Sequence, residues 1–310
     1  MVSDPKEQVP IISLESLDGS RQIVLNGESG WTHLPGATGL EMPPFDIVTS
    51  QVPGVYGSVL EDVLVEERPI FIPMDAASPD YRRVTHQAML SEIQELVDPL
   101  RGEFRVVCGE RHLKVIYTDG LEGAFGVNEF GLYWRKFGLK ALACQPFAES
   151  REPRSVEFQI DVTGKAFLGA PWGTQQLTSS AVISNDMKVQ VGSEVPVHPT
   201  VELVGPMDSF TGTVNGPGGR LWKVSVPEGV PTGSTLRLVT DPRARSIRMG
   251  PGDPSKDPSW TGELAAGLVQ RGSSLSPFYP GQNLMSVAAP GGTADTRIRI
   301  RWIDLHRSLW

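Results

Sequence analysis

Residues able to support acid–base or metal chemistry are spread along the sequence and do not gather in motifs. The five histidines each lie in a different expected element: His33, His86, His112, His198 and His306. None has the spacing of an HExxH or paired-ligand motif, and the sequence has no nucleophile elbow, phosphate-binding loop or dinucleotide fingerprint. We therefore assign no catalytic, cofactor-binding or metal-ligating residue. The sequence favours a protein that is not an enzyme and needs no cofactor. A glycan or peptidoglycan hydrolase with scattered catalytic residues stays open.

Adjacent acids do not form a catalytic pair either. Glu61–Asp62 and Glu66–Glu67 lie in an expected strand, where neighbouring side chains point to opposite faces and cannot share one substrate. A solvated strand edge is the role that we expect for these carboxylates.

Aromatic side chains suggest a different function, the binding of sugar rings. Trp172, Trp222 and Trp260 lie in the β-rich second half of the chain, where exposed rings would stack on a glycan. Packing in the core or in an interface is the commoner role of such residues. Recognition of a cell-surface glycan is therefore the alternative function.

The two cysteines, Cys108 and Cys144, are each flanked by apolar residues in segments that are typical of strands. Synthesis in the cytoplasm disfavours a disulfide, so we expect two buried free thiols. No histidine stands at ligand spacing from either cysteine, which argues against a zinc site.

Length and composition indicate a two-domain β protein. The 310 residues exceed the usual length of one domain, and 33 Gly with 26 Pro indicate many turns, while 39% hydrophobic residues indicate a real core. The amino terminus lacks the pattern of a signal peptide, and no apolar run approaches the ~18 residues of a membrane span. We therefore expect a soluble chain, made in the cytoplasm and without a membrane partner.

Charge patterning argues against nucleic acid as a partner. The net charge is −8, and the densest basic cluster alternates with apolar residues near the carboxyl terminus. Arg297, Arg299 and Arg301 are predicted to form one polar face of a strand.

One helix is expected, over residues 79–98. Ser78 can cap it, Pro79 suits its first turn and Pro99 ends it. Its apolar positions recur at helical spacing: Met89, Ile93, Leu96, Val97 and Leu100.

The remaining elements are predicted strands. Residues 104–120 read as a hairpin and residues 131–147 as a long strand, whereas Pro69 and Pro73 favour an edge or bulged position for the strand that they interrupt. A polar segment at 148–155 suggests a domain boundary, which divides the chain into residues 1–150 and 151–310. Short strands with regular turns in the second half predict a β-sandwich or jelly roll.

The order of several turn motifs resembles a known family. A Pro-Gly-x-x-Gly turn at Pro53, Gly54 and Gly57 precedes a strand with Arg68, Ile70 and Ile72, and residues 97–102 (VDPLRG) follow the helix. The second half adds, in order, Gly192, Pro196, Pro199, Gly205, Pro206, Asn215, Gly233, Pro277, Gly281 and Asn283. Over residues 50–290 this order is similar to that of siphovirus distal tail proteins, including minor tail proteins of phages that infect actinobacteria. The insert around residues 250–270 departs from the pattern.

The resemblance implies a structural virion protein at the distal end of the tail. In that family the amino-terminal domain is a split β-barrel with one α-helix, like tail tube proteins, and six copies form a ring around the channel. A galectin-like β-sandwich projects outward, although this sequence lacks the lectin His-Asn-Arg signature, so no sugar binding follows from the fold.

The same resemblance supplies the expected partners. They are the tail tube protein on one side and the tail-tip hub or a tail-associated lysin on the other, with the tape measure protein as a further candidate. DNA would pass through the channel without specific binding. Edge strands could close the ring, and residues 60–74 and 104–118 are candidate hairpins for that contact. The last strand, at residues 296–310, stays in the second domain or returns to the first.

Overall fold

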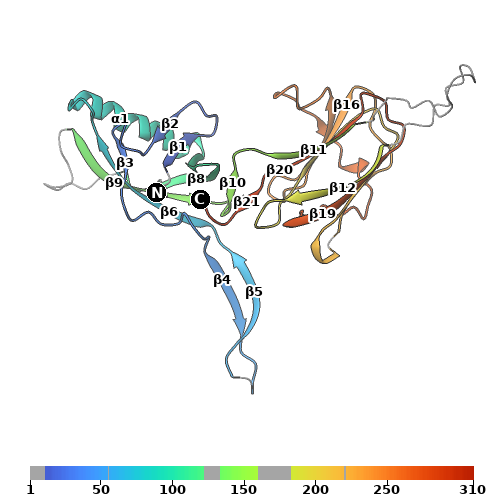
Figure 1. Ribbon diagram of the computed structural model, residues 1–310, viewed down its shortest axis with the longest axis horizontal. Helices are drawn as coiled ribbons and strands as arrows, with labels where there is room; N and C mark the ends of the chain where they lie inside the picture. The colour runs from blue at the N-terminus through green and yellow to red at the C-terminus, as the bar shows by residue number, and fades with distance from the viewer. Residues whose placement is uncertain (1–10, 55, 122–132, 160–182, 220) are drawn as a thin grey trace, which may run out of the picture. The chain divides into compact units, whose positions relative to one another are not determined.

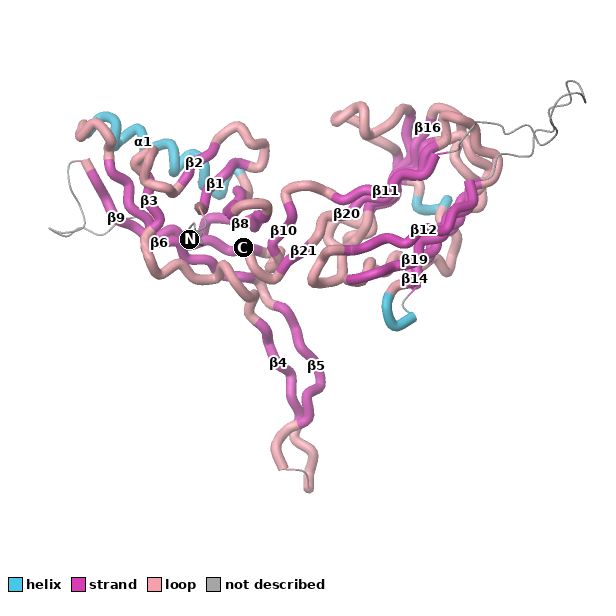
Figure 2. Tube along the Cα trace, in the orientation of Figure 1, coloured by secondary structure: helices cyan, strands magenta, loops and turns pink. Residues whose placement is uncertain are grey.

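The computed structural model describes residues 11–54, 56–121, 133–159, 183–219 and 221–310 (Figure 1). The chain divides into two compact units: unit 1 comprises Met1–Arg151 and His306–Trp310, and unit 2 comprises Glu152–Leu305. Unit 2 is therefore inserted between two parts of unit 1. Strands make up 49% of the chain and helix 9%, and Figure 2 shows how strands predominate over helix, so the prediction of a mainly β protein is confirmed.

Unit 1 contains a large antiparallel sheet, a separate hairpin and one α-helix. Its main sheet has the strand order β2-β1-β7-β8-β9-β6-β3, and an isolated bridge between Asn26 and Thr32 links its two ends, so that the sheet nearly closes like a barrel. The elements are β1 (Ile12–Ser16), β2 (Gln22–Val24), β3 (Trp31–His33), β4 (Phe45–Ser50), β5 (Val59–Val65), β6 (Arg68–Ala77), α1 (Arg83–Val97), β7 (Phe104–Cys108), β8 (Arg111–Asp119), β9 (Trp134–Ala143), β10 (Ala148–Ser150) and β21 (Leu305–His306).

Alternation of side chains places the core of unit 1 on one face of this sheet. In β6, Ile70, Ile72 and Met74 are buried. Leu139 is buried in the neighbouring strand β9. Helix α1 adds Met89, Ile93, Leu96 and Val97 to the same core, as its apolar spacing predicts.

The ends of α1 differ in how well the sequence indicates them. Residue Pro99 follows the helix as predicted and opens a single 3-10 turn, η1 (Pro99–Arg101). The helix begins at Arg83, so the predicted start at residue 79 is wrong. Ser78 and Asp80 instead accept hydrogen bonds from the Arg82 amide and hold a turn before the helix. Leu100, the last of the apolar positions at helical spacing, lies beyond the helix and is 94% exposed.

The structure corrects both predicted edge hairpins. Strands β7 and β8 do form a hairpin, but β1 and β9 flank it on either side, so it is not an edge. Residues 60–74 are not a hairpin, because β5 pairs with β4 and β6 belongs to the main sheet.

Strand β6 is not an edge strand, contrary to the prediction from its prolines. It pairs along its whole length with β9, and on its other side it meets β3 and Thr38. Phe71, between Pro69 and Pro73, exchanges two backbone hydrogen bonds with Thr38, and Pro73 only accepts one, from Leu34. Proline has no backbone N–H to donate. At Pro69 and Pro73 this missing donor would point away from β9, toward the side of β6 that pairs only with β3 and Thr38.

Unit 2 consists of two sheets around one core, as expected for a β-sandwich. The six-stranded sheet has the order β11-β20-β13-β16-β17-β18 and the four-stranded sheet the order β12-β19-β14-β15. The strands are β11 (Arg154–Gln159), β12 (Ile183–Val191), β13 (Thr200–Val204), β14 (Phe210–Asn215), β15 (Leu221–Val226), β16 (Ser234–Val239), β17 (Ser246–Pro251), β18 (Glu263–Leu264), β19 (Gly281–Ala289) and β20 (Arg297–Trp302), with 3-10 turns η2 (Pro217–Gly219) and η3 (Ala266–Leu268).

Both sheets supply the buried residues of this core. Leu203, Leu236 and Ile300 come from the six-stranded sheet, and Phe210 and Trp222 from the four-stranded sheet. The insert at residues 250–270 forms the end of β17, a loop, β18 and η3, so it extends the six-stranded sheet at one edge.

Candidate assembly and binding surfaces

The residues considered for catalysis do not come together. His33, His86 and His112 lie on β3, α1 and β8, His198 lies in unit 2, and His306 lies on β21 in unit 1. Burial lowers the pKa of His33, His86 and His198, which favours their neutral forms. Within the described ranges, no group of three or more His, Cys, Asp or Glu side chains could hold a metal ion.

Unit 1 has an open hollow beside its helix. It has a volume of about 600 Å³ and lies beside the carboxyl end of α1, where Glu95, Asp98 and Tyr117 contribute to its lining. Glu95 already pairs with Arg21 and Arg101. Asp98 also pairs with Arg101, so arginines accompany both carboxylates of this hollow.

Three tryptophans are candidates for stacking on a glycan, and burial excludes one of them, Trp222, from that role. Trp222 is 2% exposed and packs edge-to-face against Phe278 at 5.7 Å between ring centroids, so it belongs to the core. Trp260 is partly exposed, and its indole N–H donates to the carbonyl of Pro251 at 2.8 Å. Trp172 lies outside the described residues.

The cysteines and the adjacent acids are only partly as predicted. Cys108 is buried, and burial raises the pKa of its thiol, but Cys144 is exposed, so the prediction of two buried thiols is wrong for one of them. Cys144 lies in a bend directly after β9, which ends at the buried Ala143. The acid pairs Glu61–Asp62 and Glu66–Glu67 are exposed, as expected.

The hairpin β4–β5 carries the largest set of exposed apolar residues in unit 1. Its two strands pair only with each other in the described sheets, and Gly54 and Gly57 take positive φ values of 85° and 87° at its tip. Every residue of β5 is exposed, including three consecutive apolar residues whose side chains alternate between its faces. We call this set the hairpin surface: Phe45, Ile47, Val52, Tyr56, Val59, Leu60, Val63, Leu64 and Val65.

Such a surface is costly for a lone chain in water. A two-stranded hairpin is marginally stable by itself, and exposed contiguous apolar area marks a protein contact. Figure 1 shows β4 and β5 extending away from the rest of unit 1. The hairpin can therefore bury apolar side chains against a partner and offer its free strand edges for pairing.

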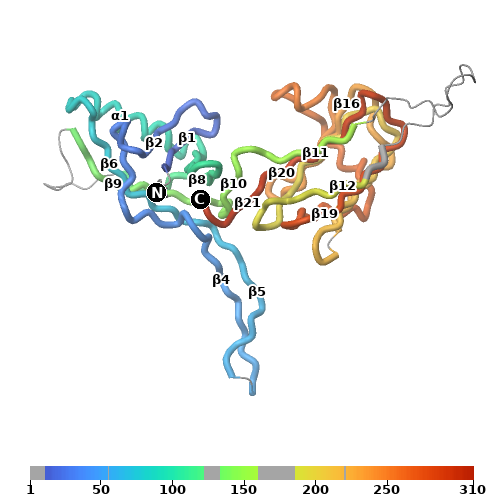
Figure 3. The backbone as a smooth tube through the Cα atoms, viewed as in Figure 1, coloured from blue at the N-terminus to red at the C-terminus, as the bar shows by residue number. Residues whose placement is uncertain are grey.

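The carboxyl terminus is fixed inside unit 1 by two arginines. Arg68 is completely buried and donates to the carbonyls of Gly39, Pro146 (3.0 Å) and Arg307 (2.9 Å), while Arg111 donates to Ser308 and Trp310. Burial lowers the pKa of Arg68 to about 10. The last residues, red in Figure 3, thus lie among strands that come early in the sequence.

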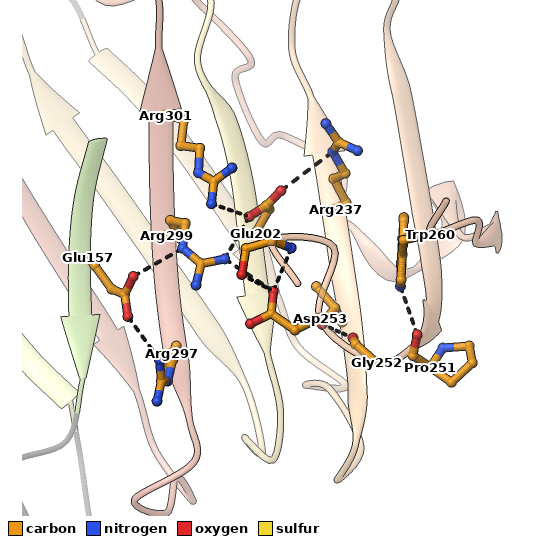
Figure 4. Close-up of polar contacts among 12 residues, drawn as sticks. Glu157, Glu202, Arg237, Pro251, Gly252, Asp253, Trp260, Arg297, Arg299 and Arg301 are labelled. Carbon is orange, nitrogen blue, oxygen red and sulfur yellow. Dashed lines mark hydrogen bonds and ion pairs between the residues drawn. The ribbon is translucent and has the colours of Figure 1, made fainter. Parts of the chain in front are cut away.

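The six-stranded sheet of unit 2 carries an ionic network on its outer face (Figure 4). Arg299 donates to Glu157 at 3.0 Å, to Glu202 at 3.0 Å and to Asp253 at 3.2 Å. Burial alone would lower the pKa of Arg299, but these three carboxylates raise it above its ordinary value. Burial alone would raise the pKa of Asp253, yet its bonds to Ser255 and Arg299 lower it to about 2.

The predicted polar face of the last long strand is confirmed, with one difference. Ile298, Ile300 and Trp302 face the core, and Arg299 on the opposite face is also buried, beneath its carboxylate partners. Sequence reasoning missed Glu157, Glu202 and Asp253 as partners, because they come from elements more than forty residues away along the chain.

The described part of the chain contains no helix that is long and apolar enough to cross a membrane. No protein-family model and no curated protein sequence matches the chain.

A solved structure of a phage protein shares the fold. The Dit protein of phage SPP1, described as a paradigm of the hub adsorption apparatus in phages that infect Gram-positive bacteria, matches 96% of this chain and 99% of its own, with a TM-score of 0.62 and 11% identity. Two structures of the phage P2 baseplate in its activated conformation, with Ca and with Sr, match at TM-scores of 0.49 and 0.46, with 8% and 9% identity. These matches span 97% and 93% of this chain, and 100% and 99% of the baseplate chains. The family resemblance predicted from the sequence is thus confirmed at the level of the fold.

Proposed function

We propose that this chain is a structural protein of a tailed-phage virion, a distal tail protein that forms a ring at the end of the tail. The observation that carries the proposal is the fold shared with the SPP1 Dit protein over nearly the whole of both chains. Both units contribute to that match, so it does not rest on one common β module.

The hairpin surface supports assembly into a ring. A closed ring needs a contact between two different patches of neighbouring copies, and an exposed hairpin reaching from one copy to the next supplies one of them. Ile47 and Leu60, at 61% and 58% exposed, would become buried there. We propose a hexamer, as the family resemblance implies, with unit 1 as the tail-tube-like, ring-forming part and unit 2 as a galectin-like sandwich on the outside.

The proposed partners follow from that position. One side of the ring would contact the tail tube protein, and the other the tail-tip hub or a tail-associated lysin, with the tape measure protein ending nearby. DNA would pass through the channel without specific contacts, which agrees with the net charge of −8. We assign no residue a catalytic role.

Negative-stain electron microscopy and native mass spectrometry of the full chain, alone and with purified tail tube protein, test this proposal. Six-fold rings with a central hole, formed by the chain alone or on the tube, are the expected result. A chain that stays monomeric at high concentration both with and without the tube protein would overturn the ring.

A further inference from the structure

The outer face of the six-stranded sheet in unit 2 has an unbalanced row of charges. Strand register places one residue from each of six strands in line across it: Glu157, Arg299, Glu202, Arg237, Arg248 and Leu264. Charges alternate in sign along this row until Arg237, which stands directly opposite Arg248. Like charges opposite each other destabilise a sheet unless something neutralises them.

The acids on this face do not neutralise the second arginine. Glu202 lies 3.0 Å from Arg299, 3.7 Å from Arg301 and 3.7 Å from Arg237, so one carboxylate serves three guanidinium groups. Arg248 is exposed, and its hydrogen bond goes to the carbonyl of Gly262, not to an acid.

The balance of the whole network is therefore positive. Five arginines, at positions 237, 248, 297, 299 and 301, stand against Glu157, Glu202 and Asp253, which leaves two positive charges. The chain as a whole has a net charge of −8, so this face is locally opposite in sign.

Trp260 lies on the same face, over Gly250 of β17. Gly250 and Arg248 are two residues apart on β17, so both face outward, and a Cβ on Gly250 would lie 3.2 Å from Cζ2 of the Trp260 ring. The hydrogen bond from the indole N–H to Pro251 fixes the ring there, as Figure 4 shows. We call Arg237, Arg248 and Trp260 the Arg–Trp patch.

We propose that the Arg–Trp patch binds an anionic glycan, a polymer of sugar rings that carry phosphate or carboxylate groups. Guanidinium groups pair with both anions in a two-pronged geometry, and the indole ring provides an apolar face on which a sugar ring can stack. Charge complementarity selects an anionic glycan over a neutral one. The inference goes beyond the ring proposed above and does not depend on it.

The full chain can be titrated by isothermal calorimetry at fixed salt with two matched pairs of probes. Phosphomannan is compared with dephosphorylated mannan, and polygalacturonate with its methyl ester. We expect at least one charged glycan to bind and both neutral ones not to bind. Arg248→Gln and Arg237→Gln should each weaken binding by about tenfold, the typical contribution of one charge-assisted contact.

Trp260 variants and a control complete the test. Trp260→Ala should also weaken binding, and Trp260→Phe should restore part of it. Arg271→Gln removes one exposed positive charge from the loop beside the four-stranded sheet and should leave affinity unchanged. Circular dichroism would establish that each variant keeps its fold.

Two results would overturn the proposal. One is that neither charged glycan binds. The other is that inorganic polyphosphate binds as tightly as the charged glycans and Trp260→Ala has no effect, in which case the patch takes acidic chains, such as an acidic protein segment, and not sugars. Ring formation would be unaffected by either result.

Discussion

At the scale of the residue, Arg68 shows how a motif position acquires a structural role. Its guanidinium joins three backbone carbonyls that are far apart in the sequence, at Gly39, Pro146 and Arg307. The sequence indicates only that Arg68 begins a strand. Its burial depends on segments that fold around it from both ends of the chain, which no local pattern encodes.

Replacing Arg68 should therefore destabilise unit 1. Arg68→Met keeps much of the side-chain volume but leaves buried carbonyls without donors, so we expect the free energy of unfolding to fall by about 2–4 kcal/mol. Arg82→Met is the control, since Arg82 is 79% exposed and has one ion pair at 3.8 Å, and it should change stability by under about 0.5 kcal/mol. Urea unfolding measures both; equal effects of the two variants would contradict the role given to Arg68.

Asp253 gives unit 2 a defined response to acid. Its folded pKa of about 2 lies below the ordinary value of 3.8, so the stabilisation that it provides is fully present above pH 3.8 and is lost as pH falls toward 2. Asp253→Asn should lower the free energy of unfolding at neutral pH. Between pH 4 and 2, the free energy of unfolding of this variant should fall less steeply than that of the unchanged protein.

Asp257 is the matched control for this variant. It lies in the same Asp-Pro-Ser arrangement, with Ser259 bonded to it as Ser255 is to Asp253, but no arginine pairs with it. Asp257→Asn should therefore cost less at neutral pH than Asp253→Asn, for which we expect about 1.5–3 kcal/mol. Urea midpoints across pH measure the difference, and indistinguishable midpoints would show that the Arg299 contact adds nothing.

At the scale of the element, local patterns predict which segments are strands better than which strands pair. The pattern VLVEERPIFIPM contains two extended runs separated by Glu66–Glu67, so a hairpin at residues 60–74 is a reasonable reading. The actual turn is the Pro53, Gly54 and Gly57 segment, whose glycines have positive φ. Turn chemistry was the better guide, because an acidic pair without glycine or asparagine does not favour a tight turn.

Similar limits apply to the candidate binding residues. The sequence does not separate Trp222 from Trp260, because both lie in the β-rich second half with turn residues nearby. Trp222 falls on the inward face of β15, whereas Trp260 lies in a loop over the outer face of the other sheet. Arg237 and Arg248 become a patch only through the register of β16 and β17, which depends on tertiary pairing.

The hairpin surface should control assembly without controlling folding. Leu60→Lys with Leu64→Lys places two charges at positions that are 58% and 49% exposed in the single chain, so its thermal stability should hardly change. Burying these charges between copies would be costly, so rings should be lost. Leu100→Lys changes an equally apolar residue that is 94% exposed away from the hairpin, and rings should persist. Light scattering measures the outcome; intact rings in the double variant would exclude this hairpin from the contact.

At the scale of the whole molecule, the path of the chain predicts that unit 1 can fold without unit 2. The two points where the chain crosses between units lie close together, because Ser150 Oγ and His306 Nε2 are 3.0 Å apart. A variant that joins Arg151 to His306 through a short Gly-Ser linker keeps every contact of Arg68 and Arg111 with the carboxyl terminus. We expect a folded, soluble protein with a cooperative thermal transition.

A variant that ends at Arg151 tests whether the returning residues 306–310 contribute to the stability of unit 1. It lacks the completely buried Leu309, whose amide donates to Leu40, and it leaves Arg68 without one of its acceptors. Loss of that buried leucine alone should lower stability by about 2 kcal/mol relative to the linked variant. Calorimetric melting of both proteins provides the comparison. If the two melt alike, the returning strand adds nothing to unit 1; if the linked variant does not fold, unit 1 depends on unit 2 through contacts other than the covalent chain.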